Sequence, residues 1–347
     1  MPIANLVIQG PYFRDLLDQP AAIERTLHGL RVTPELTAAA NRLAEGRFRR
    51  ILLTAMGGSL HALYPLHLQL TDAGFVCQME ETSELLRYQA KILREDTLIV
   101  VVSQSGRSAE IVSLLDQSGG ATIIGVTNYD DSPVAQRAHV PVFMNAGVEN
   151  SVSCKTYLAT LVTLKWLAAE LTGTSAGVLE SLAPAAQAVD AYLADWRAHV
   201  DFLDERLKAT RQIFLTGRGG SLATARAGGL TLKESAHFPA EGMSCAAFRH
   251  GPFEVVAPHV FVLVFAGAAR TAQLNRLLAG DIRQAGGDVE IVDFGVPQGV
   301  FRLPTAPEAI RTVLETLPVQ MLSLMLAARD GREAGRFEHL TKVTVVE

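Results

Sequence analysis

The chain carries two copies of one short motif. Residues 51–60 read ILLTAMGGSL and residues 213–222 read IFLTGRGGSL, so seven of ten positions agree at a shift of 162 residues. At the same shift the stretch TLIVVVSQSG, from Thr97, aligns with HVFVLVFAGA, from His259. This period is longer than that of solenoid repeats, which span roughly 20–50 residues. The sequence therefore predicts two copies of a whole domain.

Each copy alternates short apolar runs with helix-like stretches. Several runs are apolar without alternation, which is typical of strands covered on both faces. This order predicts an α/β fold of two tandem doubly wound parallel-sheet domains, each a three-layer sandwich. Long helices are expected over residues 155–171 and 184–207. The expected strands are residues 51–54, 75–79, 98–102, 122–126 and 140–143 in the first copy, and 213–216, 260–265 and 289–292 in the second.

The expected domain organisation follows from these elements. Residues 1–45 form an N-terminal helical segment, residues 46–175 the first domain, and residues 176–331 the second domain with its linking helix. Residues 332–347 form a C-terminal tail. Because the chain has 347 residues, of which 48% are hydrophobic and 19% charged, each domain can bury its own core.

Charge and cysteine content disfavour several classes of protein. The formal net charge of −5 argues against a nucleic-acid or anionic-membrane binder, which would present a basic face. Three scattered cysteines are too few for a disulfide framework, and no cluster has metal-ligand spacing, so we expect neither a metal nor another cofactor. The N-terminus lacks the blocks of a signal peptide, and the longest apolar run, residues 255–269, is shorter than a membrane span. The chain is therefore expected to be cytoplasmic.

The most informative loop, SQSGRS at residues 103–108, follows an apolar run. It offers three hydroxyls, a flexible glycine and the free N–H groups of a helix start. Ligands of open parallel sheets bind beyond the carboxyl ends of the strands, so the loop predicts a phosphate cradle rather than an ordinary capping turn. The matching loop of the second copy, residues 265–268, has no hydroxyl. The glycine turn before Ser59 makes that serine a second candidate contact.

Three further polar residues stand in less informative surroundings. Glu234 lies near the end of an expected helix that starts near Ser221, and it projects about 100° away from its neighbour Lys233. His250 precedes a Gly-Pro corner, and Lys342 is close to the end of the sequence. From spacing alone, a solvent-exposed side chain is the simpler interpretation of each.

Taken together, the motifs resemble those of a known family. SQSG, the segment Asn145–Val152, GRGGS, LKES, RHGP and the ending KVTVVE occur in this order. The chain resembles the tandem sugar-isomerase (SIS) domain family. Within that family, it is most similar to the isomerase half of the glutamine–fructose-6-phosphate aminotransferases, or glucosamine-6-phosphate synthases, and to their glutaminase-less relatives.

The resemblance implies a role for each candidate residue in a hexose 6-phosphate site. Glu234 would move a proton between C1 and C2, and His250 would help to open the sugar ring from across the interface of a homodimer. Lys342 would form an imine with the open-chain ketose, and the composition of Thr341–Val346 suits an ordered tail over the active site. The implied substrate-binding and phosphate-binding residues are Ser59, Ser103, Gln104, Ser105, Ser108 and Val152.

The chain also departs from the pattern of the synthases. They carry a glutaminase domain with an N-terminal cysteine, and none is expected ahead of residues that begin Met1-Pro2. Thr231 stands where the synthases have a lysine, Gly58 where they have a threonine, and Arg107 where they have an acidic residue. These departures leave the phosphosugar class intact and leave the particular reaction open.

Several functions are therefore compatible with the sequence. The preferred one is conversion of glucosamine 6-phosphate to fructose 6-phosphate and ammonia. Another phosphosugar isomerisation, deglycation of a ketosamine phosphate and a synthase-type isomerisation are alternatives. A non-catalytic phosphosugar sensor is a second kind of alternative, although a sensor would not need Glu234, His250 and Lys342 together.

Overall fold

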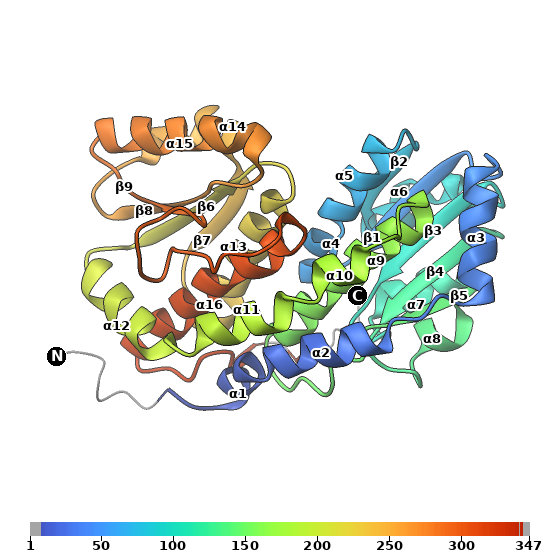
Figure 1. The fold of residues 1–347 in the computed structure, drawn as a ribbon, viewed down its shortest axis with the longest axis horizontal. Coiled ribbons are helices and arrows are strands. Elements are labelled where there is room, and N and C mark those ends of the chain that lie inside the picture. Colours follow the sequence, from blue (N-terminus) through green and yellow to red (C-terminus); the bar gives the residue numbers. More distant parts are fainter. Residues whose placement is uncertain (1–7, 340, 343–347) are drawn as a thin grey trace. The chain divides into compact units, whose positions relative to one another are not determined.

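The computed structural model describes residues 8–339, 341 and 342. It contains two parallel β-sheets, and the chain divides into two compact units (Figure 1). The first-sheet unit comprises the described residues within 21–149, 155–183 and 339–347. The second-sheet unit comprises those within 1–20, 150–154 and 184–338.

The first sheet has five parallel strands in the order β2-β1-β3-β4-β5. Its central strands β3 and β4 are buried at every position, which explains their unbroken apolar runs. On one face, Ile99 and Val101 of β3 pack against Ile111 and Leu114 of α7 and against Val134 of α8. The strands are β1 (Arg50–Ala55), β2 (Cys77–Glu81), β3 (Thr97–Val102), β4 (Thr122–Thr127) and β5 (Val140–Phe143).

The helices of the N-terminal half include several with clear start signals. Thr33 caps α3 by accepting a hydrogen bond from Leu36 N–H, and Ser132 caps α8 in the same way through Ala135 N–H. The helices are α1 (Pro11–Leu17), α2 (Gln19–Gly29), α3 (Pro34–Ala44), α4 (Gly57–Ala62), α5 (Tyr64–Asp72), α6 (Thr82–Tyr88), the 3₁₀ turn η2 (Ala90–Ile92), α7 (Ala109–Asp116), α8 (Pro133–Arg137), α9 (Lys155–Thr172) and α10 (Val178–Leu182).

The second sheet has four parallel strands in the order β7-β6-β8-β9, which repeats the order of the first four strands of the first sheet. In Figure 1, α14 and α15 lie on one side of this sheet and α13 and α16 on the other. The strands are β6 (Gln212–Gly217), β7 (Ala240–Ser244), β8 (Val260–Phe265) and β9 (Asp288–Val292). The helices are α11 (Ala185–Leu193), α12 (Trp196–Arg206), α13 (Ser221–Ala236), α14 (Cys245–Arg249), η3 (Pro252–Val255), α15 (Ala269–Gln284), η4 (Glu308–Ile310) and α16 (Arg311–Arg329).

Helix α13 lies unusually close to the edge strand β7. A Cβ atom added at Gly229 would stand 2.6 Å from Gly242 N, and one added at Gly242 would stand 2.6 Å from Arg226 Cα. Both positions therefore require glycine for close packing. This contact sets the height of α13 above the sheet, and α13 carries Glu234.

Helix α16 is the buried core helix of the second-sheet unit. Together with η4, it forms the stretch Glu308–Arg329, which within the described residues is long and apolar enough to cross a membrane. However, 89% of the apolar part of this stretch is buried inside the protein. Such burial is typical of a core helix in a globular domain.

The predicted fold class is confirmed, and so are the predicted strands, with shifts of one or two residues at some ends. The expected single helix over residues 184–207 is wrong: α11 ends at Leu193 and α12 begins at Trp196. The break allows Trp196 to pack edge-to-face on Phe13, with ring centroids 4.7 Å apart. Strand β7 was not expected, because its sequence AEGMS contains no β-branched residue.

The two sheets also correct the alignment of the second pair of repeated segments. Ile51 pairs with Leu98 in the first sheet, whereas Ile213 pairs with Phe261 in the second. The shift between the inner strands is therefore one residue longer than the motif alignment predicts. The second copy holds one additional residue between its first strand and β8.

Candidate functional site

A six-residue loop follows the buried strand β3 and leads into α7. Ser103 N–H continues the sheet by donating to Val126 O at 3.0 Å, and Gly106 N–H then turns back to Ser103 O at 3.1 Å. Val112 N–H makes the first intrahelical bond, to Ser108 O, so the N–H groups before it have no intrahelical acceptor. The loop and this helix start lie at the carboxyl edge of the sheet, where the sequence predicts a phosphate cradle.

The side chains of this loop present hydrogen-bond donors. Ser103 Oγ accepts from Gly106 N–H at 3.1 Å, and Ser105 Oγ accepts from Arg107 N–H at 3.2 Å. Each hydroxyl therefore keeps its own hydrogen for another acceptor. Ser108 occupies the N-cap position of α7 without a capping side-chain bond. Within the described part of the chain, the buried Gln104 Nε2 has no hydrogen-bond partner. This set of donors suits an anion such as phosphate.

Gly106 gives the loop its shape. Its φ of 65° lies in the left-handed region. A Cβ atom there would stand 2.5 Å from Ser132 Cβ and 2.9 Å from Thr127 Oγ1. Its neighbour Arg107 forms an exposed ion pair with Asp131 at 2.7 Å.

Ser59 lies at the same edge of the sheet, because β1 and β3 are neighbouring parallel strands. It is half-buried in the short helix α4 that follows β1. A Cβ atom added at the preceding Gly58 would meet its nearest heavy atom, Tyr157 Cδ2, only at 4.0 Å. The chain therefore has room for a larger group at the position where the synthases have threonine.

Asn128 connects the cradle to the loop after β5. Its backbone N–H donates to Gln104 O at 3.1 Å. Its side-chain Nδ2 donates to Gly147 O at 2.8 Å, and its Oδ1 accepts from Ala146 N–H at 2.8 Å. One asparagine thus holds two loops of the carboxyl edge together. Sequence reasoning missed Asn128, since an asparagine after a strand is common in ordinary turns.

Lys342 contacts a buried carboxylate of the same unit. Its Nζ lies 3.2 Å from Glu149 Oε2, and the Glu149 side chain has no exposed surface. Thr156 holds this carboxylate through its N–H at 3.1 Å and its hydroxyl at 2.6 Å. Sequence reasoning did not single out Glu149, although it lies within the segment Asn145–Val152. The remainder of the expected ordered tail, residues 343–346, lies outside the described residues.

Glu234, His250 and Val152 belong to the second-sheet unit. Lys233 is exposed and Glu234 is half-buried on α13, so the two neighbours face different directions as their spacing predicts, but Glu234 is not the solvent-exposed residue that spacing alone favoured. Desolvation raises the pKa of the Glu234 carboxyl, and the nearby charge of Lys233 opposes the shift. His250 is exposed at the end of α14, and Val152 is buried. The cradle serines, Ser59 and Lys342 belong to the first-sheet unit.

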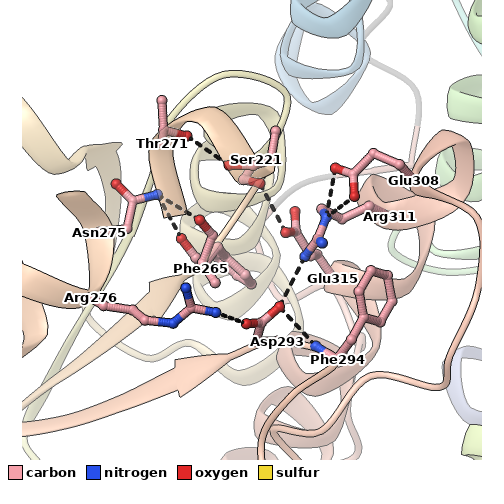
Figure 2. Close-up of polar contacts among 12 residues, drawn as sticks. Ser221, Phe265, Thr271, Asn275, Arg276, Asp293, Phe294, Glu308, Arg311 and Glu315 are labelled. Carbon is pink, nitrogen blue, oxygen red and sulfur yellow. Dashed lines mark hydrogen bonds and ion pairs between the residues drawn. The ribbon is translucent and has the colours of Figure 1, made fainter. Parts of the chain in front are cut away.

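The carboxyl edge of the second sheet differs from that of the first, because side chains of the chain itself occupy it (Figure 2). Ser221 Oγ donates to Glu315 Oε1 at 2.9 Å. Arg311 donates to Asp293 at 3.3 Å and to Glu308 at 2.7 Å, and Arg276 also pairs with Asp293. These side chains come from α13, α15, α16, η4 and the end of β9.

The loop that corresponds to the cradle is also shorter in the second copy. Three residues, 266–268, connect β8 to α15, whereas six connect β3 to α7. Ser221 corresponds to Ser59 at the shift of 162 residues, and it is already bonded to Glu315. The expected difference between the two copies is therefore present in their structures.

The buried Glu315 carboxyl is expected to make the protein less stable as pH rises. Complete burial raises its pKa from 4.5 to about 8, with Ser221 and Arg311 opposing the shift. Because the folded state binds this proton more tightly, the free energy of unfolding falls as pH rises from about 4.5 to 8, by roughly 3–5 kcal/mol. Glu315→Gln should abolish this loss, and the exposed control Glu254→Gln should retain it. Urea unfolding at pH 5, 6.5 and 8 measures the effect, and equal slopes for both variants would contradict it.

Comparison with known proteins agrees with this architecture. The SIS domain family profile matches residues 47–170 and 206–294, so the chain belongs to the SIS domain family. A glutamine–fructose-6-phosphate aminotransferase (isomerizing) of Pyrococcus horikoshii is 29% identical over 349 residues, which cover 96% of this chain and 57% of the relative. The chain thus spans little more than half the length of this curated relative.

Solved structures share the fold. The C-terminal domain of glucosamine-fructose-6-phosphate aminotransferase from Francisella tularensis superposes with a TM-score of 0.81 at 20% identity, covering 94% of this chain and 98% of that one. Glucosamine-6-phosphate deaminase from Thermotoga maritima superposes with a TM-score of 0.76 at 17% identity, covering 96% of this chain and 99% of that one. Both similarities bear on the fold alone.

Proposed function

We propose that this chain is a cytoplasmic phosphosugar aldose–ketose isomerase that acts on an amino-hexose 6-phosphate. The preferred reaction converts glucosamine 6-phosphate and water to fructose 6-phosphate and ammonia. The observation that carries the proposal is the β3–α7 loop, with its available hydroxyls, the buried Gln104 amide and the free helix N–H groups. The names of the relatives, which refer to fructose 6-phosphate and glucosamine 6-phosphate, support this substrate class.

Each proposed residue has a defined chemical task. Ser103, Gln104, Ser105 and Ser108 bind the phosphate, and Ser59 and Val152 contact the substrate. After His250 assists ring opening, Glu234 removes the proton from C2 and a proton is delivered to C1. The amine nitrogen loses one proton and the C1 oxygen gains one, which leaves an imine at C2 and a hydroxyl at C1. The amine of Lys342 displaces ammonia from this imine, and water then hydrolyses the lysine adduct to the ketose.

The environment of Glu234 supports its role as the base. A carboxylate is a weak base in water, and desolvation raises the pKa of Glu234 toward the range useful for proton transfer. Lys342 and Glu149 also form a suitable pair, because Glu149 Oε2 lies at hydrogen-bond distance from the ammonium group. In this proposal the carboxylate of Glu149 accepts the proton that the lysine loses before it attacks the substrate.

The cradle assignment predicts a large loss of affinity. Ser105→Ala combined with Ser108→Ala should weaken sugar 6-phosphate binding by about 10²-fold or more, since each hydrogen bond to a charged group contributes roughly 1.5–3 kcal/mol. The control is Ser118→Ala, just beyond the opposite end of α7. Titration calorimetry measures the dissociation constants. An unchanged affinity in the double variant would remove the cradle from the proposal.

The reaction is tested with a panel of hexose 6-phosphates and direct assays of ammonia and ketose. Ammonia and fructose 6-phosphate in equal amounts from glucosamine 6-phosphate would support the preferred reaction. Ketose without ammonia from an aldose 6-phosphate would favour simple isomerisation, and amino-acid release from a ketosamine phosphate would favour deglycation. Tight binding of a sugar phosphate with no turnover would favour the sensor.

We also propose that the enzyme is a homodimer in which His250 serves the site of the neighbouring subunit. The exposure of His250 supports this role. Inactive Glu234→Gln and His250→Ala proteins should then recover part of the activity when co-expressed, because some sites in the hybrid receive both intact groups. Turnover of purified hybrid dimers measures this effect. Complete inactivity of the hybrids would place both residues in the same subunit's site.

A further inference from the structure

The segment that leads to Lys342 is tied to the helix that carries Glu234. Within residues 332–338, which we call the strap, Gly335 N–H donates to Ser235 O at 2.8 Å. Ser235 immediately follows Glu234 on α13. Gly335 O accepts from Ser151 Oγ at 2.5 Å, and Ser151 is adjacent to Val152. Gly335 is thus hydrogen-bonded to two residues, and each of these is adjacent in sequence to a proposed site residue, Glu234 or Val152.

The first residue of the strap is held in the same region. Arg332 donates to Glu338 Oε1 at 2.5 Å and lies 3.2 Å from His237 Nδ1. His237 ends α13 in a left-handed conformation with φ 51°. Arg332 N–H also donates to Ala327 O at 2.8 Å, which ties the strap to α16. Both ends of the strap are therefore fixed to the C-terminal end of α13.

Gly335 is the position where the strap has no room for a side chain. Its φ is 74°, and an added Cβ atom would stand 2.7 Å from Tyr12 Cβ and closer still to Ser151 Oγ. Tyr12 cannot move freely, because it is fully buried and its hydroxyl bonds Ser323 Oγ at 3.1 Å, and Ser151 is buried as well. A side chain at Gly335 must therefore displace the strap itself.

We propose that Gly335 is a positioning residue for the base Glu234, because the hydrogen bond from Gly335 N–H to Ser235 O holds the last turn of α13, which carries Glu234. A side chain at Gly335 shifts the strap, and the shift acts on α13 through this hydrogen bond. The same shift releases Ser235 O and loosens the last turn of α13. The catalytic part of this inference rests on the proposed isomerase function, but the anchoring of the strap does not.

The chain provides a matched control. Gly331 also has a left-handed backbone, with φ 69°, but a Cβ atom added there would meet no heavy atom within 4 Å. Gly331→Ala therefore carries the same kind of backbone strain as Gly335→Ala without the steric clash. Ser151→Ala is a gentler probe, because it removes one hydrogen bond to Gly335 O and adds no atoms.

The test combines kinetics with hydrogen–deuterium exchange. Gly335→Ala should lower kcat at least tenfold relative to Gly331→Ala, with KM for the sugar phosphate within threefold. Ser151→Ala should lower kcat about threefold to tenfold. Without substrate, amides of the strap, residues 332–338, should exchange at least tenfold faster in Gly335→Ala than in Gly331→Ala. Equal kcat values for the two glycine variants would overturn the positioning role, and equal exchange would overturn the anchoring.

If the unmodified enzyme turns over no hexose 6-phosphate, the proposed function fails, and exchange still decides the anchoring.

Discussion

Glu234→Gln is expected to lower kcat by about 10²-fold or more while leaving KM for the sugar phosphate nearly unchanged. Glutamine keeps the shape of the side chain but cannot take a proton from C2, so only the chemical step is lost. Exchange of the C2 proton with deuterated solvent measures this step directly. Exchange at the normal rate in the variant would remove Glu234 as the base.

The same residue sets the expected pH profile. Because desolvation raises the pKa of Glu234, the acid limb of kcat should lie at higher pH than for an ordinary carboxylate. The exposed neighbour Lys233 opposes that shift, so Lys233→Gln is the matched control. It should keep the plateau value of kcat and move the acid limb to higher pH. A loss of the plateau in Lys233→Gln would mean that the lysine itself takes part in the reaction.

Lys342→Arg is expected to reduce turnover by at least 10²-fold. Arginine keeps the positive charge beside Glu149 but cannot form an imine with the substrate. Sugar phosphate binding should change little, because the cradle is formed by other residues. Borohydride reduction in the presence of substrate, followed by mass spectrometry, should find a sugar adduct on Lys342 in the unmodified enzyme and none in the variant.

The control for this experiment is Lys208→Arg, at an exposed lysine that pairs with Glu205. It should retain both turnover and the adduct. Normal turnover of Lys342→Arg would contradict the imine role. The bond between Lys342 and the buried Glu149 would then only anchor the end of the chain.

The positions of the central strands could be predicted because each is marked in the sequence by its own run of apolar residues. Residues 98–102 and 260–265 are apolar at every position, and a strand covered by helices on both faces needs that pattern. The cradle loop could be located for the same reason, since a run of serines and a glycine after a buried strand is visible in the sequence. The motif at 51–60 and 213–222 likewise indicated two domains of one architecture.

Long-range contacts decided what no local pattern indicates. Strand β7 exists because AEGMS pairs with β6 and because Gly229 and Gly242 let α13 approach it. No local pattern in the sequence distinguishes Glu149, Asn128 or Gly335. Each forms hydrogen bonds with residues from other segments of the chain. The sequence by itself therefore determined the central strands and the position of the loop that carries the proposed phosphate cradle, whereas the tertiary structure decided which polar groups are buried and which partners they meet.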